Sequence, residues 1–233
     1  MGILKKLEGS VDCLFCRKAH APKQTPPEHV IPESLYGTLT TYYVCKACNG
    51  YFGRKLESSL LEYPEIRTAK KRLSIGPPRK NPPLKVTKIR TFKRFLSKIA
   101  LEFLGETNYQ LAMDPSFNRW RDFVRRNSGG SQIADRITYE DLFQALQGFR
   151  PVAERSWHAI LLLEIEGELL CEINLYSQLL AKVWFGPPPD GKRVRYYEMI
   201  QSIRRKPRGG EIKCRFSQAW DPACSEPFPP ALT

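Results

Sequence analysis

Apolar side chains between residues 92 and 104 recur with the spacing of a single helix face. The set comprises Phe92, Phe95, Leu96, Ile99, Ala100, Phe103 and Leu104. Positions three and four residues apart share one face of an α-helix, so the pattern predicts an amphipathic helix with a buried apolar stripe. Lys93, Arg94 and Lys98 lie off this stripe, and Gly105 is placed to end the helix in the left-handed conformation.

Two further helices are predicted downstream. Asp114-Pro115 provides an N-cap followed by a first-turn proline, which is the usual start of a helix. The residues expected to pack inward from this helix are Phe117, Trp120 and Val124. The run Thr138-Tyr139-Glu140-Asp141 has the pattern of a capping box before a short third helix that ends near Gly148.

From residue 157 the hydrophobic period changes to two, which indicates β-strands with one buried face. The alternating sets are Trp157, Ala159, Leu161, Leu163 and Ile165, then Leu169, Cys171, Ile173 and Leu175, then Ala181, Val183 and Phe185. Glu166-Gly167 is a tight hairpin signal, and a last strand is expected from about Arg193 to Ile200. The pattern predicts an antiparallel meander covered by the helices, and His158 and Cys171 are expected to be structural core residues.

These patterns divide the chain into segments. The first, residues 8–66, contains most of the candidate chemistry. Residues 67–88 form a basic linker that is rich in proline and cannot continue a helix or a central strand. Residues 89–203 hold the helices and the meander, and residues 204–233 are rich in Arg, Pro and Gly and are expected to be a flexible tail.

Composition and charge narrow the function classes. Hydrophobic residues make up 42% of the chain, which is ordinary for a packed globular protein and argues against wholesale disorder. The net charge of +13 indicates a polyanionic partner, with nucleic acid favoured over a membrane. No apolar run has the length of a membrane span, and residues 1–6 lack the apolar core of a signal peptide. We therefore expect a cytoplasmic protein whose cysteines are reduced.

Four cysteines form two C-x-x-C pairs, Cys13/Cys16 and Cys45/Cys48. Each such turn lets two thiolates reach one ion, and two turns complete a closed tetrahedral shell. The segment that contains these cysteines, about fifty residues long, has too small a hydrophobic core to fold unaided. Metal binding would therefore supply folding energy. The spacing predicts a structural Zn²⁺ held by four thiolates.

Further motifs surround these cysteines. The pentapeptide Glu28-His29-Val30-Ile31-Pro32 lies between the two pairs, and Asn49 follows Cys48 directly, opening the run Asn49-Gly50-Tyr51-Phe52-Gly53. On these motifs residues 10–62 resemble the HNH nuclease family, in which a hairpin and a helix surround one divalent metal. The resemblance implies a small zinc-stabilised ββα-metal unit. Together with the helical segment packed with an antiparallel β-meander that the periodicity predicts, this makes the expected fold class α+β.

The resemblance also implies roles for individual residues. His29 corresponds to the base that activates water, and Glu28 and Asn49 correspond to ligands of the catalytic metal. Glu57 is either a third ligand or a solvated helix residue. Asn49 is expected near the start of a helix that runs to about Leu61, where an N-cap role is compatible with metal binding. Oxygen ligands of this kind suit Mg²⁺ or Mn²⁺.

Basic residues are expected to hold the phosphate backbone, with DNA favoured over RNA as the partner. The candidates are Arg54, Lys55, Lys93, Arg94, Arg121 and Arg125. A single HNH site cuts one strand, so cleavage of both strands requires a homodimer, two independent nicks or a larger assembly.

One departure from the family keeps alternative functions open. The stretch 38–44 lacks the middle Asn that braces the hairpin in HNH proteins, although Thr40 or Thr41 could form hydrogen bonds in its place. A zinc-stabilised module that binds nucleic acid without cutting it therefore competes with the endonuclease. A third hypothesis makes the chain the effector subunit of a larger assembly.

Overall fold

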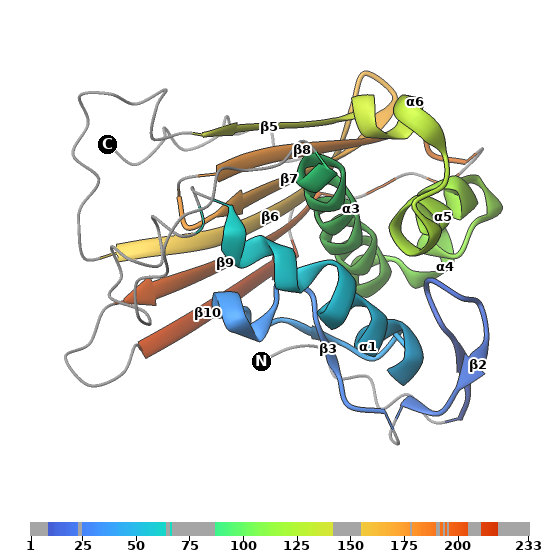
Figure 1. Ribbon diagram of the computed structural model, residues 1–233, viewed down its shortest axis with the longest axis horizontal. Coiled ribbons are helices and arrows are strands. Elements are labelled where there is room, and N and C mark those ends of the chain that lie inside the picture. The colour runs from blue at the N-terminus through green and yellow to red at the C-terminus, as the bar shows by residue number, and fades with distance from the viewer. Residues whose placement is uncertain are drawn as a thin grey trace.

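The computed structural model describes residues 9–22, 25–63, 66, 87–141, 155–177, 179–189, 192, 194, 196–204 and 211–218. It contains helices and antiparallel sheets, which confirms the predicted α+β class. Figure 1 shows helix α3 lying across one face of a large sheet, with the N-terminal unit beside it. None of the helices in the described ranges has the length and apolar character needed to cross a membrane.

The N-terminal unit consists of two small hairpins and a helix. Strand β1 (Val11–Asp12) pairs with β2 (Ala19–His20), and β3 (Glu28–His29) pairs with β4 (Thr40–Thr41), both antiparallel. The 3-10 helix η2 (Glu33–Leu35) lies between β3 and β4. Helix α1 (Lys46–Lys55) and the 3-10 helix η3 (Glu57–Glu62) follow. The helix therefore begins earlier than predicted, because Cys45 is its N-cap.

The second segment is helical, as predicted. Its elements are α3 (Thr87–Thr107), α4 (Tyr109–Ala112), η4 (Pro115–Phe117), α5 (Asn118–Arg126) and α6 (Gly130–Asp135). The Asp114 cap is confirmed, since its carboxylate accepts a hydrogen bond from the Ser116 amide at 2.9 Å. The prediction that Gly105 ends α3 is wrong. A Cβ at Gly105 would lie 3.2 Å from Leu14 Cδ2, so this glycine admits the side chain of Leu14.

A six-stranded antiparallel sheet completes the fold, after the N-terminal unit and the helical segment. Its strands are β5 (Ile137–Asp141), β6 (Arg155–Ile165), β7 (Glu168–Leu175), β8 (Leu179–Gly186), β9 (Tyr197–Arg204) and β10 (Glu211–Gln218). Their order is β10-β9-β6-β7-β8-β5. The predicted meander β6-β7-β8 is confirmed, and the predicted faces of β7 and β8 are buried. The predicted face of β6 is wrong: Ile160 and Leu162 lie in the core, opposite Ile173 and Cys171 of β7, whereas Ile165 is exposed. Strands β5 and β9 continue the meander at its two edges.

Both edges of the sheet require corrections. Residues 138–141 belong to strand β5 and not to a helix, because Ile137 pairs with Val183 of β8 and this pairing overrides the local capping signal. The rest of the predicted third helix, residues 142–148, lies outside the described residues. Strand β9 begins at Tyr197, later than predicted, and β10 falls in the segment predicted to be a flexible tail. In sequence, residues 211–218 alternate apolar and polar side chains, which allows a strand once β9 offers a free edge.

The apolar stripe of α3 is completely buried, which confirms the predicted amphipathic helix. It packs between the N-terminal unit and strands β6, β7 and β8 in one continuous core. Lys98 is an exception to the prediction, because it lies off the apolar stripe and is nevertheless fully buried. Residues 67–86, the greater part of the predicted linker, lie outside the described residues.

The sheet also holds the loop that follows β3. The Leu35 carbonyl oxygen accepts hydrogen bonds from His158 Nε2 at 2.8 Å and from the Tyr176 hydroxyl at 3.0 Å. Gln201 of β9 accepts from the Thr38 amide at 3.0 Å and donates to the Tyr36 carbonyl. The loop between β3 and β4 is thereby fixed to strands far away in the sequence.

Candidate metal centre and nuclease site

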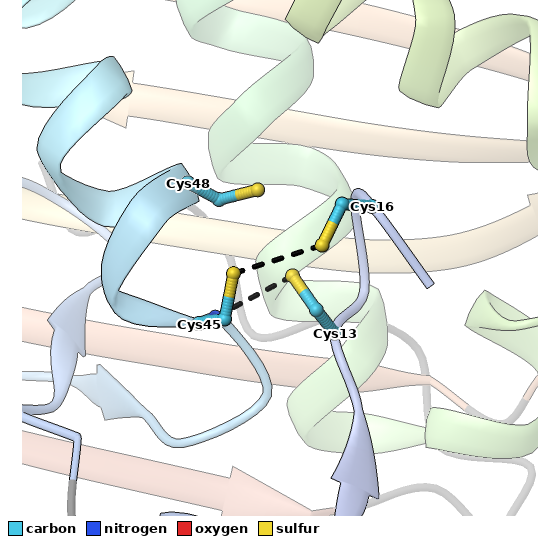
Figure 2. A group of neighbouring side chains, drawn as sticks. All are labelled: Cys13, Cys16, Cys45 and Cys48. Atoms are coloured by element: carbon cyan, nitrogen blue, oxygen red, sulfur yellow. Dashed lines mark hydrogen bonds between the residues drawn. The ribbon is translucent and has the colours of Figure 1, made fainter. Parts of the chain in front are cut away.

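The four cysteines of the two C-x-x-C pairs converge on one point. Cys13 and Cys16 come from the turn between β1 and β2, and Cys45 and Cys48 come from the start of α1 (Figure 2). All four sulfur atoms lie within 4.8 Å of one another. The Cys16 and Cys45 sulfurs are 3.6 Å apart, and a tetrahedral shell with zinc–sulfur bonds of ~2.3 Å places its sulfurs ~3.8 Å apart. The donor set and spacing fit a structural zinc ion.

The local environment favours a thiolate at this point. A hydrogen bond with the Cys48 thiol lowers the pKa of Cys13 to about 4 and raises the pKa of Cys48. The Cys45 amide also points at the Cys13 sulfur, with nitrogen and sulfur 3.4 Å apart. Burial raises the pKa of Cys16. One negative charge is therefore stabilised by the protein itself, and a bound cation would favour the thiolate form of Cys16 and Cys48.

The cysteine turn is anchored to the helical segment. Arg121 Nε donates to the Leu14 carbonyl at 2.8 Å, and Arg17 donates to the Met113 carbonyl at 2.7 Å. The Tyr109 hydroxyl of α4 donates to the Asp12 carbonyl at 2.7 Å. The position of the cysteine turn therefore depends on contacts with residues 109–121 as well as on the cysteines themselves.

The β3–β4 hairpin carries the acid and histidine of the predicted nuclease site. Glu28 pairs with Thr41 and His29 with Thr40. Because neighbouring side chains of a strand point to opposite faces, Glu28 turns inward and is only 4% exposed, whereas His29 is half-buried. The Glu28 carboxylate therefore faces the protein interior, whereas the His29 imidazole lies on the other face of the strand.

Glu28 and Glu57 meet at the amino group of Lys98. Lys98 Nζ lies 2.6 Å from Glu28 Oε1 and 3.3 Å from Glu57 Oε1, and Glu102 of the same helix contributes a third carboxylate at 3.1 Å. Burial raises the pKa of Glu28 and Glu102, and the Lys98 charge opposes this. The three carboxylates raise the pKa of Lys98, outweighing its burial. Glu57 is partly buried, since 20% of its side chain is exposed and its carboxylate pairs with Lys98.

Lys98 and Glu102 were missed from the sequence as parts of the site. Their spacing, four residues apart on a predicted helix, was the available signal for an ion pair. Nothing local indicated that the pair would face the hairpin, which lies 69 residues earlier than Lys98. All three carboxylates contact the same ammonium group. Among the described residues, the four cysteines form the only group of three or more potential ligands whose donor atoms all lie within 4.8 Å.

Asn49 lies in the first turn of α1, directly after Cys48, and is half-buried. The main-chain N–H of Asn49 donates to the Cys45 carbonyl at 3.0 Å, as in a residue inside the helix. The interpretation of Asn49 as the N-cap is therefore wrong. Cys45 takes that position because its extended backbone precedes the helix. Cys45, Cys48 and Asn49 thus lie together at the start of α1, and metal binding at the cysteines would fix the position of Asn49.

The basic residues expected to bind nucleic acid separate into two groups. Arg54 and Lys55 are exposed at the end of α1, and Arg125 is half-buried. Arg94 and Arg121 are buried, which contradicts their predicted role on the surface. Lys93 donates to the Ala134 carbonyl at 2.7 Å.

The two buried arginines donate to several main-chain oxygen atoms. Arg94 donates to the Val124 carbonyl at 2.7 Å and to the Tyr51 hydroxyl at 2.8 Å. Arg121 donates to the carbonyls of Leu14 and Asp114 and, by a short contact, to that of Ala112. A guanidinium has five donors in a planar fork, which suits it to joining several chain segments.

Comparison with known proteins supports the resemblance to HNH nucleases for part of the chain. No curated protein and no solved structure shows a significant match to this sequence. Residues 13–63, which include the four cysteines, the β3–β4 hairpin and α1, match the family described as HNH endonuclease.

Proposed function

We propose that the protein is a metal-dependent endonuclease that hydrolyses phosphodiester bonds of nucleic acid, with DNA favoured as the substrate. The observation that carries this proposal is the arrangement of residues 13–63. An acid–histidine strand, Glu28-His29, lies in the same compact unit as a four-cysteine cluster and a helix whose first turn contains Cys48 and Asn49, and this unit matches the HNH endonuclease family.

In this proposal each residue has a separate task. His29 lies half-buried on β3, where its imidazole would take a proton from the attacking water. The Glu28 carboxylate and the Asn49 amide oxygen are hard donors that would hold Mg²⁺ or Mn²⁺, with Glu57 as a further carboxylate. The bound ion would stabilise charge on the scissile phosphate and on the leaving oxygen.

The exposed ends of the unit provide a binding surface for the substrate. Arg54 and Lys55 are exposed on the last turn of α1, the helix that carries Asn49. Contacts of this kind with phosphates confer affinity but little sequence selectivity. A protein with one such site nicks one strand, so linear product would form after nicked product unless the active form is a homodimer or a larger assembly.

The test uses supercoiled plasmid with Mg²⁺ or Mn²⁺. Wild-type protein is expected to nick the plasmid, EDTA to prevent nicking, and His29→Ala to lower the rate by about 100-fold or more through loss of the base. His20→Ala is the matched control, because His20 also lies in the N-terminal unit but contacts the Tyr42 carbonyl. Zinc content and affinity for DNA are measured for both variants. Undiminished cutting by His29→Ala would refute the assignment of the base.

A second function, nucleic-acid binding without cleavage, is favoured by the pairing of Glu28 with Lys98. Glu28 Oε1 lies 2.6 Å from the Lys98 ammonium nitrogen. A carboxylate whose charge is already balanced by a lysine is a weaker ligand for a metal. The same plasmid experiment separates the two functions. Absence of nicking, together with a gel shift that weakens as salt concentration rises, would support the binding module or a subunit that requires a partner.

A further inference from the structure

One amino group contacts both residues of the acid–histidine strand. Lys98 Nζ lies 2.6 Å from Glu28 Oε1 and donates to the His29 carbonyl at 3.1 Å. The lysine comes from α3, outside the segment that matches the HNH family. Its side chain is fully buried, so it has no alternative partner in solvent. The position of β3 is therefore determined in part by a helix of another segment.

The lysine is itself held by a second carboxylate on α3. Glu102 Oε2 lies 3.1 Å from Lys98 Nζ, and both side chains are completely buried. The other oxygen of Glu102, Oε1, is buried and has no hydrogen-bond partner among the described residues. With Glu28 and Glu57, three carboxylates surround one ammonium group, so the cluster is short of positive charge.

We propose that Lys98 is a positioning residue for the nuclease site, holding the Glu28 carboxylate and the His29 main chain in place, and that its charge limits the affinity of that site for a divalent cation. This inference rests on the proposed function for its effect on cleavage. Its effect on cation binding is independent of cleavage.

The direction of each effect follows from the charges. Replacing Lys98 with methionine removes a positive charge next to Glu28, so a divalent cation should bind more tightly, while the hairpin loses its anchor and cleavage slows. Replacing Glu102 with glutamine removes a negative charge that competes with Glu28 for the ammonium group. Lys98 should then pair more strongly with Glu28, and the cation should bind more weakly.

The experiment measures Mn²⁺ binding to zinc-loaded protein by electron paramagnetic resonance, together with the cleavage rate at saturating Mn²⁺. For Lys98→Met we expect the half-saturating Mn²⁺ concentration to fall by on the order of tenfold and the cleavage rate to fall by about tenfold or more. For Glu102→Gln we expect the half-saturating concentration to rise by about threefold or more. A purely structural role would weaken binding in both variants.

Two further variants make the result decisive. Lys182→Met is the matched control, because Lys182 pairs with Glu172 on the sheet, away from the hairpin, and should leave Mn²⁺ binding unchanged. Lys98→Arg keeps the charge and serves if Lys98→Met does not fold. Its half-saturating concentration should stay within about threefold of wild type while cleavage slows.

The proposal requires shifts of opposite sign in Lys98→Met and Glu102→Gln, or a rise in Glu102→Gln with little change in Lys98→Arg. Any other pattern of Mn²⁺ binding overturns it. If wild-type protein cuts no substrate, the proposed nuclease function fails, but the Mn²⁺ measurements still decide whether Lys98 controls the cation affinity of the cluster.

Discussion

At the scale of single residues, His158 shows how burial changes a titratable group. Its Nδ1 accepts from the Tyr176 amide at 3.2 Å, so Nε2 carries the proton that is donated to the Leu35 carbonyl. Both ring nitrogens are therefore used in the neutral form. Burial lowers the pKa of His158 to about 4, against 6.5 in the unfolded chain, and outweighs the hydrogen bond to Leu35. The expected structural role of this histidine is confirmed.

This pKa predicts acid sensitivity. Between pH 6.5 and 4 the unfolded chain binds a proton at His158 and the native protein does not, so the free energy of unfolding falls as the pH decreases. The loss attributable to His158 should reach about 2 kcal/mol at pH 5. Urea denaturation of wild type and His158→Gln at pH 7 and pH 5 measures it. An equal loss in both proteins would show that His158 is not the cause.

At the scale of elements, the short helices are held by side chains from their neighbours. Asn127 ends α5 in the left-handed conformation, and Arg94 of α3 donates to the carbonyls of Phe123 and Val124 at that end. The last carbonyls of a helix lack partners within it, and a buried cation there supplies donors. Arg94 thus joins α3 to α5.

The buried and exposed arginines should therefore respond differently to substitution. Arg94→Met should lower the free energy of unfolding by roughly 2–4 kcal/mol, because several buried carbonyls lose their donors. Arg54→Ala should leave stability nearly unchanged and weaken nucleic-acid binding, reducing the slope of log affinity against log salt concentration by about 0.9. Urea denaturation and fluorescence anisotropy at several salt concentrations measure the two properties. The reverse result would mean that Arg94 reaches the ligand.

At the scale of the whole molecule, α3 connects the metal-binding unit with the sheet. The hydrophobic core is continuous from Leu14 through the buried face of α3 to Ile160. The elements described in the N-terminal unit are short: two-residue strands, two 3-10 helices and one α-helix of ten residues. We therefore expect its stability to depend on metal binding at the four cysteines and on packing against α3.

Zinc removal should act in two stages. Chelation is expected to unfold the cysteine turns and the start of α1 while the sheet keeps its strands, because the sheet is paired independently of the cysteines. Hydrogen exchange should show lost protection in residues 9–63 before residues 155–186. Elemental analysis should give about one zinc per chain. Loss of protection in both regions at the same chelator concentration would indicate a single cooperative unit.

Several parts of this protein were predictable from the sequence because their signals are local. The cysteine spacing, the apolar stripe of α3, the Asp114 cap and the alternation in β7 and β8 each involve residues close together in the chain. Periodicity determines which side chains share a face, and that much holds whatever the element packs against. The candidate base His29 was found in the same way, from a short motif.

Only the tertiary structure decided which charged residues are buried and what they contact. Arg94, Lys98 and Arg121 have the sequence character of surface residues, and their partners lie between 3 and 107 residues away. A buried charge is stable only where distant segments supply its partners. The secondary structure at Glu140 was also decided by a distant segment. Pairing with β8 makes residues 137–141 a strand, although the local sequence favours a helix start. The sequence alone determined the zinc ligands and the acid–histidine motif, and the packing of α3 determined their surroundings.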